Sequence, residues 1–293
     1  MNNKDHINIH LSINSGQYFL WEKMKNIWYG IYGENILKIT EIENKKKDGI
    51  IYEFDSFPEY NNWQNYIFRQ DDNYDEIIHE ISKNIKIKNI IQKYPGLRIL
   101  RQKPIQCIFS FLCSSNNNIP RIRLMLKNLS KKYGKKIIFD DIEFYTFPDL
   151  KSISTASIQD LLSCGLGYRA KFISSSAKDI LNERIDIELR KKEYEIAKEE
   201  LLKLDGIGEK IADCILLFSF DKLEAFPIDV WIIKYLYQNL QQVLKTPIKS
   251  NSKVSAGQYR KISKEIRNYY GKYSGYVQQY IYFSIREENN RKW

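Results

Sequence analysis

The spacing of apolar residues changes character once along this chain of 293 residues, at about Tyr74. Before that point, apolar positions alternate with polar ones or gather in β-branched and aromatic runs bounded by glycine-containing breaks. This pattern is typical of strands and hairpin turns. Strands are predicted over residues 7–13, 25–32, 36–42 and 50–54, with turns at 32–35 and 47–49. We therefore predict an antiparallel sheet in the N-terminal part of the chain.

From Tyr74 onward, apolar residues recur at intervals of three and four, which is the spacing of an amphipathic helix. Pro104 is well placed to begin a long apolar helix over 105–115, because the first turn does not need its missing N–H. Further helices are predicted over residues 121–133, 158–164, 169–183, 193–203, 209–218, 230–240, 257–270 and 275–288.

The two patterns together predict an α+β protein with two parts. Residues 1–100 are expected to form an antiparallel β-sheet domain with helices, and residues 101–293 an all-α body. We expect the last helix, 275–288, to pack back towards the N-terminal domain.

Composition adds a preferred class of partner. The chain has 46 Lys and Arg against 36 Asp and Glu, a formal net charge of +10, which favours a polyanion such as nucleic acid. The N-terminus lacks a signal-peptide pattern, and no apolar run approaches the ~18 residues that span a bilayer, so we expect an intracellular protein and no membrane partner. Because the four cysteines lack paired CxxC spacing, no metal or cofactor is expected.

The most informative segment is a turn between two predicted helices, Leu204-Asp-Gly206-Ile-Gly208. Glycine allows positive φ and close approach of a ligand to the backbone, and the N–H groups that begin the next helix form an anion site. Apolar residues on both sides of the turn would pack the two helices together. This predicts a helix–hairpin–helix at about 197–218 that holds a DNA phosphate through Gly206 and Gly208. An ordinary helix end followed by a turn is the structural alternative.

Two ionisable residues near this turn are candidate catalytic groups. Lys210 lies in the first turn of the second helix, where burial and the helix dipole would disfavour its charged form and activate it as a nucleophile. A solvated surface charge is the alternative. Asp229 precedes a predicted helix, as a capping residue does. A carboxylate fixed in this way could also stabilise an oxocarbenium-like sugar.

Several segments of the chain, taken together, resemble one family. They are Ser15-Gly16-Gln17, Leu97-Arg-Ile-Leu-Arg-Gln102 and residues 109–119, 165–170, 206–214, 227–230 and 273–278. Over about residues 10–288, the chain is similar to the 8-oxoguanine DNA glycosylases of the helix–hairpin–helix superfamily, in the branch of the eukaryotic enzyme and its bacterial relatives. The resemblance implies a TATA-binding-protein-like N-terminal sheet domain. It also implies an enzyme that flips and removes 8-oxoguanine opposite cytosine and then cleaves the abasic site.

The resemblance implies roles for the residues that would face the damaged nucleotide. Lys210 would attack C1′ and become a Schiff base that permits β-elimination, and Asp229 would assist glycosidic cleavage electrostatically. The base would be read by four residues: Cys214 on one face, Tyr282 on the other where the family usually has Phe, Gly16 through its carbonyl, and Gln278 at the pairing edge.

Other residues would contact the DNA that remains, according to the same resemblance. Asn116, Arg121 and Arg169 would contact the estranged cytosine, and Tyr168 would enter the base stack. Their structural alternatives are a helix break, phosphate contacts and an ordinary core position. Trp231 stands where eukaryotic members tend to carry His near a phosphate. It can still donate one hydrogen bond.

Two rival hypotheses stay open: a helix–hairpin–helix glycosylase of other base specificity, and a non-catalytic DNA-binding module. The lysine at 210 argues against a monofunctional alkylbase glycosylase, and the absence of a C-terminal cysteine cluster argues against a thymine-glycol or adenine glycosylase. In a binding module, Lys210 and Asp229 would be replaceable with little effect beyond binding. We expect a monomer that acts on double-stranded DNA containing 8-oxoguanine. It would be located in the cytoplasm with the nucleoid if bacterial, or in the nucleus if eukaryotic.

Overall fold

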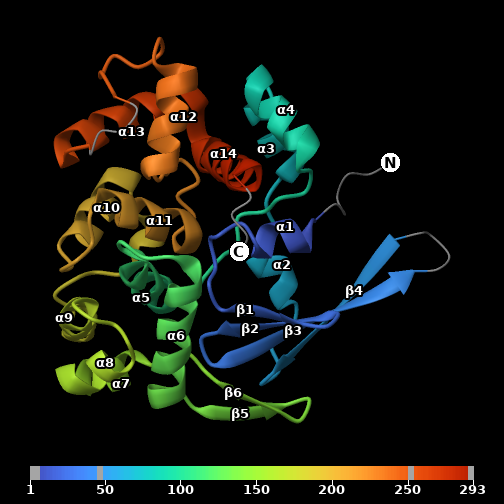
Figure 1. Ribbon diagram of the computed structural model, residues 1–293, viewed down its shortest axis with the longest axis vertical. Coiled ribbons are helices and arrows are strands. Elements are labelled where there is room, and N and C mark those ends of the chain that lie inside the picture. Colours follow the sequence, from blue (N-terminus) through green and yellow to red (C-terminus); the bar gives the residue numbers. More distant parts are fainter. Residues whose placement is uncertain (1–6, 45–48, 250–253, 290–293) are drawn as a thin grey trace. The chain divides into compact units, whose positions relative to one another are not determined.

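The computed structural model describes residues 7–44, 49–249 and 254–289 (Figure 1). The chain forms two compact units that are interleaved along the sequence. Unit 1 consists of Met1–Gln17, Phe68–Arg101 and Ile185–Trp293, and unit 2 consists of Tyr18–Ile67 and Gln102–Arg184. The division of the chain at residue 100 stays a prediction.

Unit 2 contains a four-stranded antiparallel sheet with neighbouring strands in chain order. Its strands are β1 (Trp21–Met24), β2 (Ile27–Tyr32), β3 (Asn35–Asn44) and β4 (Gly49–Phe57). Tyr32 pairs with Asn35 across the predicted turn between β2 and β3. Residues 47 and 48 of the other predicted turn lie outside the described residues. The antiparallel sheet is thus confirmed.

The prediction of a strand over residues 7–13 is wrong, because this segment contains the helix α1 (Ile9–Ile13) of unit 1. Asn8 caps the helix: its side chain accepts a hydrogen bond from the Leu11 N–H at 2.9 Å. Ile9, Ser12 and Ile13 are buried at helical spacing. A stretch this short satisfies both periodicities, and the cap decides between them. The first strand of the sheet is instead Trp21–Met24.

The helical part of unit 2 contains one hairpin that the sequence analysis did not predict. Strands β5 (Lys136–Phe139) and β6 (Ile142–Tyr145) pair through a turn at Asp140 and Asp141, whose φ angles are +53° and +59°. Aspartate tolerates this left-handed region, and two such residues in succession suit a two-residue hairpin turn. The helices of unit 2 are α2 (Trp63–Ile67), α5 (Pro104–Ser114), α6 (Ile119–Tyr133), α7 (Leu150–Thr155), α8 (Ile158–Ser163) and α9 (Arg169–Leu181).

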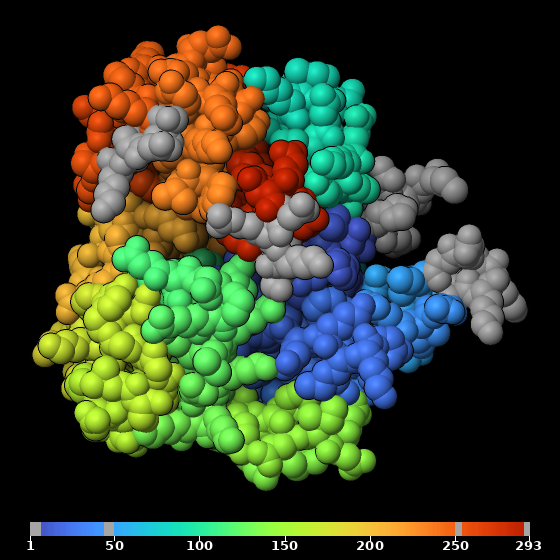
Figure 2. Space-filling view, in the orientation of Figure 1, coloured from blue at the N-terminus to red at the C-terminus, as the bar shows by residue number. Residues whose placement is uncertain are grey.

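Unit 1 is helical in the residues that the structure describes. Besides α1 it contains α3 (Tyr74–Ile81), α4 (Ile85–Lys93), α10 (Tyr194–Leu202), α11 (Glu209–Ser219), α12 (Val230–Leu240), α13 (Ala256–Tyr270) and α14 (Ser274–Glu288). Helix α14 is central, because every residue from Ser274 to Ile281 is buried. It packs against α3, α4, α12 and α13, and Figure 2 shows it in red between α12 in orange and α4 in cyan. The predicted α+β class is confirmed.

An ion cluster fixes the connection between α11 and α12. Asp221 forms ion pairs with Arg69 at 2.6 Å, with Arg101 at 3.0 Å and with Arg190 at 3.1 Å. Burial raises the pKa of Asp221, but the arginines outweigh it and the pKa lies below its usual value. The cluster therefore anchors the segment that leads to Asp229.

None of the described helices is long and apolar enough to cross a membrane.

Candidate active site

The predicted helix–hairpin–helix is formed by α10, the turn at 203–208 and α11. Gly206 has a φ of +83°, a conformation that glycine adopts without steric cost. Gly208 has an extended φ of −99° and is the residue before α11. Apart from its two chain neighbours, none of the described residues places an atom within 4 Å of the position that a Cβ would take there. Since the fold leaves room for a side chain at Gly208, a need for glycine would come from a ligand approaching the backbone.

Four of the predicted site residues come together beside this hairpin, from three separate elements. Lys210 and Cys214 lie one turn apart on α11, and the lysine amine and the thiol form a hydrogen bond. Asp229, at the start of α12, and Tyr282, on α14, act electrostatically on the same amine. The predicted nucleophile, carboxylate and two base-covering side chains thus form one cluster within unit 1.

The ionisation of Lys210 differs from the sequence-based expectation. Burial lowers the pKa of the amine, but the acidic groups Cys214, Asp229 and Tyr282 and the hydrogen bond to Cys214 raise it more, and the pKa lies above its usual value. Burial thus acts on Lys210 in the predicted direction, but the neighbouring acidic groups outweigh it. Because an amine must be unprotonated to attack, a proton has to leave Lys210 before any reaction.

The neighbouring thiol is also protonated at neutral pH. Burial raises the pKa of Cys214 to about 11, while Lys210 opposes this shift. Cys214 therefore presents a neutral, polarizable sulfur atom next to the amine. Such a group suits packing against a flat ring better than nucleophilic attack.

Asp229 has the capping geometry that the sequence predicts. Its Oδ1 accepts hydrogen bonds from the N–H groups of Trp231 and Ile232, both at 2.9 Å. Burial raises the pKa of this carboxyl, whereas the two backbone hydrogen bonds and Lys210 oppose the rise. Both capping hydrogen bonds end on Oδ1. The cap therefore does not use the second carboxylate oxygen, which could interact with a reacting group. Capping and electrostatic catalysis are compatible here.

Gly16 lies in a turn after α1 with a φ of +76°. Buried amide side chains hold this turn: Gln279 Nε2 donates to the Ser15 carbonyl at 2.8 Å, and Gln17 Nε2 donates to Ser15 Oγ at 2.7 Å. The first bond ties the turn to α14, the helix that carries Gln278. The backbone around Gly16 is therefore fixed before any ligand binds.

Gln278 shows a polar atom that the fold leaves unsatisfied. Its side chain is 5% exposed, and its Oε1 has no hydrogen-bond partner among the described residues. Burying an amide oxygen without a partner costs about 1–3 kcal/mol, so such an atom suits a residue that waits for a ligand. It lies one helical turn before Tyr282 on α14.

Sequence reasoning missed two residues that support this cluster. Arg286 Nη1 donates to the Tyr282 hydroxyl at 3.2 Å, and its charge lowers the pKa of Asp229. Gln279 holds the Ser15 carbonyl as described above. The spacing of four between Tyr282 and Arg286 on one helix could have indicated their contact, whereas nothing local pairs Gln279 with Ser15.

A second group of predicted residues lies in unit 2, at the turn between α5 and α6 and the start of α9. Asn116 has a φ of +47°. The guanidinium of Arg169 donates to the Ser115 carbonyl and lies over the Tyr168 ring, with Cζ 4.5 Å from its centroid. Tyr168 is 52% exposed, so the alternative of an ordinary core position is wrong. Arg121 is exposed in the first turn of α6.

Trp231 is half-buried in the first turn of α12. The preceding residue, Val230, is 77% exposed. The structure thus places both residues at the N-terminal end of α12, beside the carboxylate that caps it.

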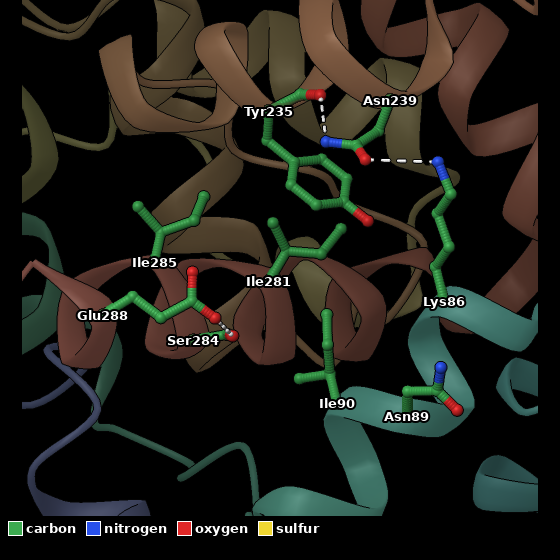
Figure 3. A pocket seen from close by; sticks show the side chains of 9 residues that line it. All are labelled: Lys86, Asn89, Ile90, Tyr235, Asn239, Ile281, Ser284, Ile285 and Glu288. Atoms are coloured by element: carbon green, nitrogen blue, oxygen red, sulfur yellow. Dashed lines mark hydrogen bonds between the residues drawn. The ribbon is translucent and has the colours of Figure 1, made fainter.

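A separate hollow of about 260 Å³ lies among α4, α12 and α14, and Figure 3 shows the side chains that line it. Hydrogen bonds join some of the polar groups in its lining. Lys86 Nζ donates to Asn239 Oδ1 at 3.2 Å, and Ser284 Oγ donates to Glu288 Oε1 at 3.0 Å. None of the predicted site residues lines this hollow.

Comparison with known proteins matches the chain to two protein families. Residues 1–108 match the family "8-oxoguanine DNA glycosylase, N-terminal domain", and residues 109–256 match the family "HhH-GPD superfamily base excision DNA repair protein". The N-glycosylase/DNA lyase OGG1 of Arabidopsis thaliana is 33% identical over 212 residues, which are 69% of this chain and 55% of that protein. The chain spans about half the length of the curated relatives it matches.

Solved structures are similar over most of the chain. The apo-form of the 8-oxoguanine glycosylase/lyase of Clostridium acetobutylicum has a TM-score of 0.80 and 31% identity, covering 92% of this chain and 90% of that one. The same enzyme in complex with double-stranded DNA containing cytosine opposite 8-oxoguanine has a TM-score of 0.79 and 30% identity, covering 94% and 90%.

Proposed function

Because this chain belongs to the HhH-GPD superfamily of base excision DNA repair proteins, we propose that it is a bifunctional DNA glycosylase and abasic-site lyase. Its substrate would be double-stranded DNA containing 8-oxoguanine opposite cytosine. One observation carries this proposal: Lys210, Cys214, Asp229 and Tyr282 converge from three elements in a chain similar over most of its length to 8-oxoguanine glycosylases.

The first step is recognition of an extruded base. Cys214 and Tyr282 would cover its two faces, and the unsatisfied Oε1 of Gln278 would accept a hydrogen bond from its pairing edge. The carbonyl of Gly16 would accept the N–H that 8-oxoguanine has and guanine lacks. Guanine would leave this carbonyl without a hydrogen-bond partner. Because a buried polar group without a partner is costly, the site would discriminate strongly against guanine.

The second step is displacement of the base by Lys210. After the amine loses a proton, its nitrogen forms a bond to C1′ while the bond from C1′ to the base breaks, and the departing base takes the bonding electron pair and a proton. The carboxylate of Asp229, fixed by two backbone N–H groups, would stabilise the positive charge that develops on the sugar.

The third step is cleavage of the strand. Opening of the sugar ring converts the lysine adduct into a Schiff base, and loss of a proton from C2′ then expels the 3′ phosphate by β-elimination. Gly206 and Gly208 would hold a backbone phosphate against the N-terminus of α11, and Trp231 would contact a neighbouring phosphate.

Unit 2 would contact the opposite strand. Asn116, Arg121 and Arg169 would read the estranged cytosine, and the exposed ring of Tyr168 would enter the base stack. We further propose that the protein acts as a monomer and without a metal or cofactor.

The test is product analysis on a duplex with a single 8-oxoguanine, opposite each of the four bases in turn. We expect release of 8-oxoguanine together with β-elimination, fastest when cytosine lies opposite. Intact duplexes with 8-oxoguanine, combined with excision of an alkylated base, would favour a glycosylase of other specificity. Tight binding without cleavage of any lesion would favour the DNA-binding module.

A further inference from the structure

We propose that Tyr259 is a positioning residue that sets the placement of Asp229 relative to Lys210. This inference rests on the proposed function, which gives these two residues their roles. Tyr259 lies on α13 and is buried. Its hydroxyl group bridges the helix that carries Lys210 and the backbone that leads to Asp229.

The bridge consists of two hydrogen bonds with a defined direction. The Ile228 N–H donates to the Tyr259 hydroxyl oxygen at 3.0 Å, and the Tyr259 hydroxyl donates to Asp213 Oδ2 at 2.7 Å. A backbone N–H can only donate, so the hydroxyl proton has to point towards Asp213. Each group in the chain thus has one role, and the bridge has one arrangement.

The ends of the bridge adjoin the two catalytic candidates. Asp213 lies three residues after Lys210 on α11, and Ile228 immediately precedes Asp229. The Ile228 N–H is therefore the backbone donor next to that of Asp229, and Pro227 before it has none. Fixing this donor limits how far the start of α12 can move with respect to α11.

Asp213 is anchored independently of Tyr259, which makes it a firm end point. Its Oδ1 accepts hydrogen bonds from Lys198 Nζ at 2.9 Å and from the Tyr194 hydroxyl at 2.5 Å. Both partners lie on α10, and the carboxylate is fully buried. Tyr194 and Tyr259 therefore donate to the same carboxylate, but Tyr259 also accepts the bond from Ile228.

This difference supplies a matched pair of variants. Tyr259→Phe removes the bridge and leaves the Ile228 N–H without its acceptor, whereas Tyr194→Phe removes one donor to Asp213 and leaves the bridge intact. A displacement of about 1 Å at a reacting group can cost on the order of 100-fold in rate. We expect Tyr259→Phe to lower single-turnover excision by at least about tenfold, or ~1.4 kcal/mol, and Tyr194→Phe to stay within about twofold of wild type.

The experiment compares three quantities for each variant. They are excision of 8-oxoguanine at saturating enzyme, borohydride trapping on a pre-formed abasic site, and binding to a duplex with an uncleavable lesion analogue. Trapping needs Lys210 but no departure of a base. We therefore expect Tyr259→Phe to lose excision selectively, with trapping and binding within about threefold of wild type.

Thermal unfolding of each variant provides the check on folding. A second variant, in which an ester replaces the Ile228 amide, removes the N–H from the other end of the bridge and should show the same selective loss. It replaces Tyr259→Phe if that variant does not fold. Equal excision by the Tyr259 and Tyr194 variants, or parallel loss of excision, trapping and binding, would overturn the positioning role.

Variants Lys210→Gln and Asp229→Asn separate this inference from the proposed function. If both lose excision while Tyr259→Phe behaves as Tyr194→Phe does, only the positioning role fails. If Lys210→Gln excises and traps as wild type does, the assignment of Lys210 as the nucleophile fails, and this inference loses its premise. If wild-type protein itself releases no 8-oxoguanine, the proposed function fails.

Discussion

The two candidate site regions of the molecule differ in how their side chains are held. In unit 1, hydrogen bonds within the fold fix both Asp229 and the turn at Gly16. The Trp231 N–H donates to Asp229, and the Gln279 side chain donates to the backbone of the turn. In unit 2, Tyr168 is more than half exposed, and Arg169 donates a hydrogen bond to the backbone carbonyl of Ser115. Catalysis requires reacting side chains that are held in place before the substrate binds. A surface that enters a deformed duplex needs an exposed ring on a firm base.

The largest expected effect that sharpens this comparison is on Asp229→Asn. Asparagine caps helices about as well as aspartate, so stability should change little, whereas loss of the negative charge should slow excision about 100- to 1,000-fold. Single-turnover kinetics and DNA binding measured together would check this.

Asp149→Asn is the matched control, because Asp149 caps α7 by accepting from the Ser152 N–H at 2.7 Å. It should leave excision unchanged. Parallel losses of excision and DNA binding in Asp229→Asn would instead support a capping role alone.

The second effect is the pH dependence of excision. The pKa of Lys210 lies above its usual value, so the neutral amine is a minor form that increases about tenfold per pH unit below that pKa. Excision should therefore rise with pH from about 6 to about 9 without reaching a plateau. Single-turnover rates across this range, with binding kept saturating, would measure it. A rate that is flat or falls over the range would contradict the proposed state of Lys210.

In unit 2, replacement of Tyr168 by alanine should weaken the interaction with lesion-containing DNA and leave the stability of the fold largely unchanged. Stacking of an aromatic ring on a base contributes about 1–3 kcal/mol, so we expect excision or lesion binding to weaken about tenfold. The melting temperature should change little, because Tyr168 is 52% exposed. Tyr168→Phe, which keeps the ring, should behave as wild type does. A fall in melting temperature with normal excision would show that the ring packs instead of entering DNA.

The smallest effect should come from Tyr282→Phe. This change keeps the ring that would cover the base and removes only the hydroxyl that accepts from Arg286. We expect a loss of about 0.5–1.5 kcal/mol in the free energy of unfolding and excision within about twofold of wild type. Tyr282→Ala should lower excision much more. Equal losses in both variants would mean that the hydroxyl, and not the ring, is what the site uses.

Local signals explain which parts of the fold were predictable. Most helices from Pro104 to Glu288 follow from apolar periodicity and from caps such as Asp229 and Ser255, which directly precede their helices. The short helix α7, Leu150–Thr155, is not among the predicted ones. The segment 7–13 is so short that its apolar residues fit both the helical and the strand periodicity, so periodicity alone does not predict its helix. The hairpin at 136–145 was missed although its two aspartates and flanking apolar runs carry the information.

The site divides in the same way. Lys210 and Asp229 stand in a recognisable pattern, but the pKa of Lys210 depends on Asp229 and Tyr282, which come from other helices. The bridge through Tyr259 joins residues 213, 228 and 259. No spacing rule links positions so far apart, so ionisation and placement become visible only when the chain is folded.

Borohydride trapping tests the central claim, that Lys210 is the nucleophile, most directly. Wild-type protein and Lys210→Gln would be incubated with a duplex containing 8-oxoguanine opposite cytosine, and the reduced covalent complex measured. We predict an adduct for wild type and none for Lys210→Gln, although the variant still binds the duplex. An adduct of equal yield from Lys210→Gln would contradict the account.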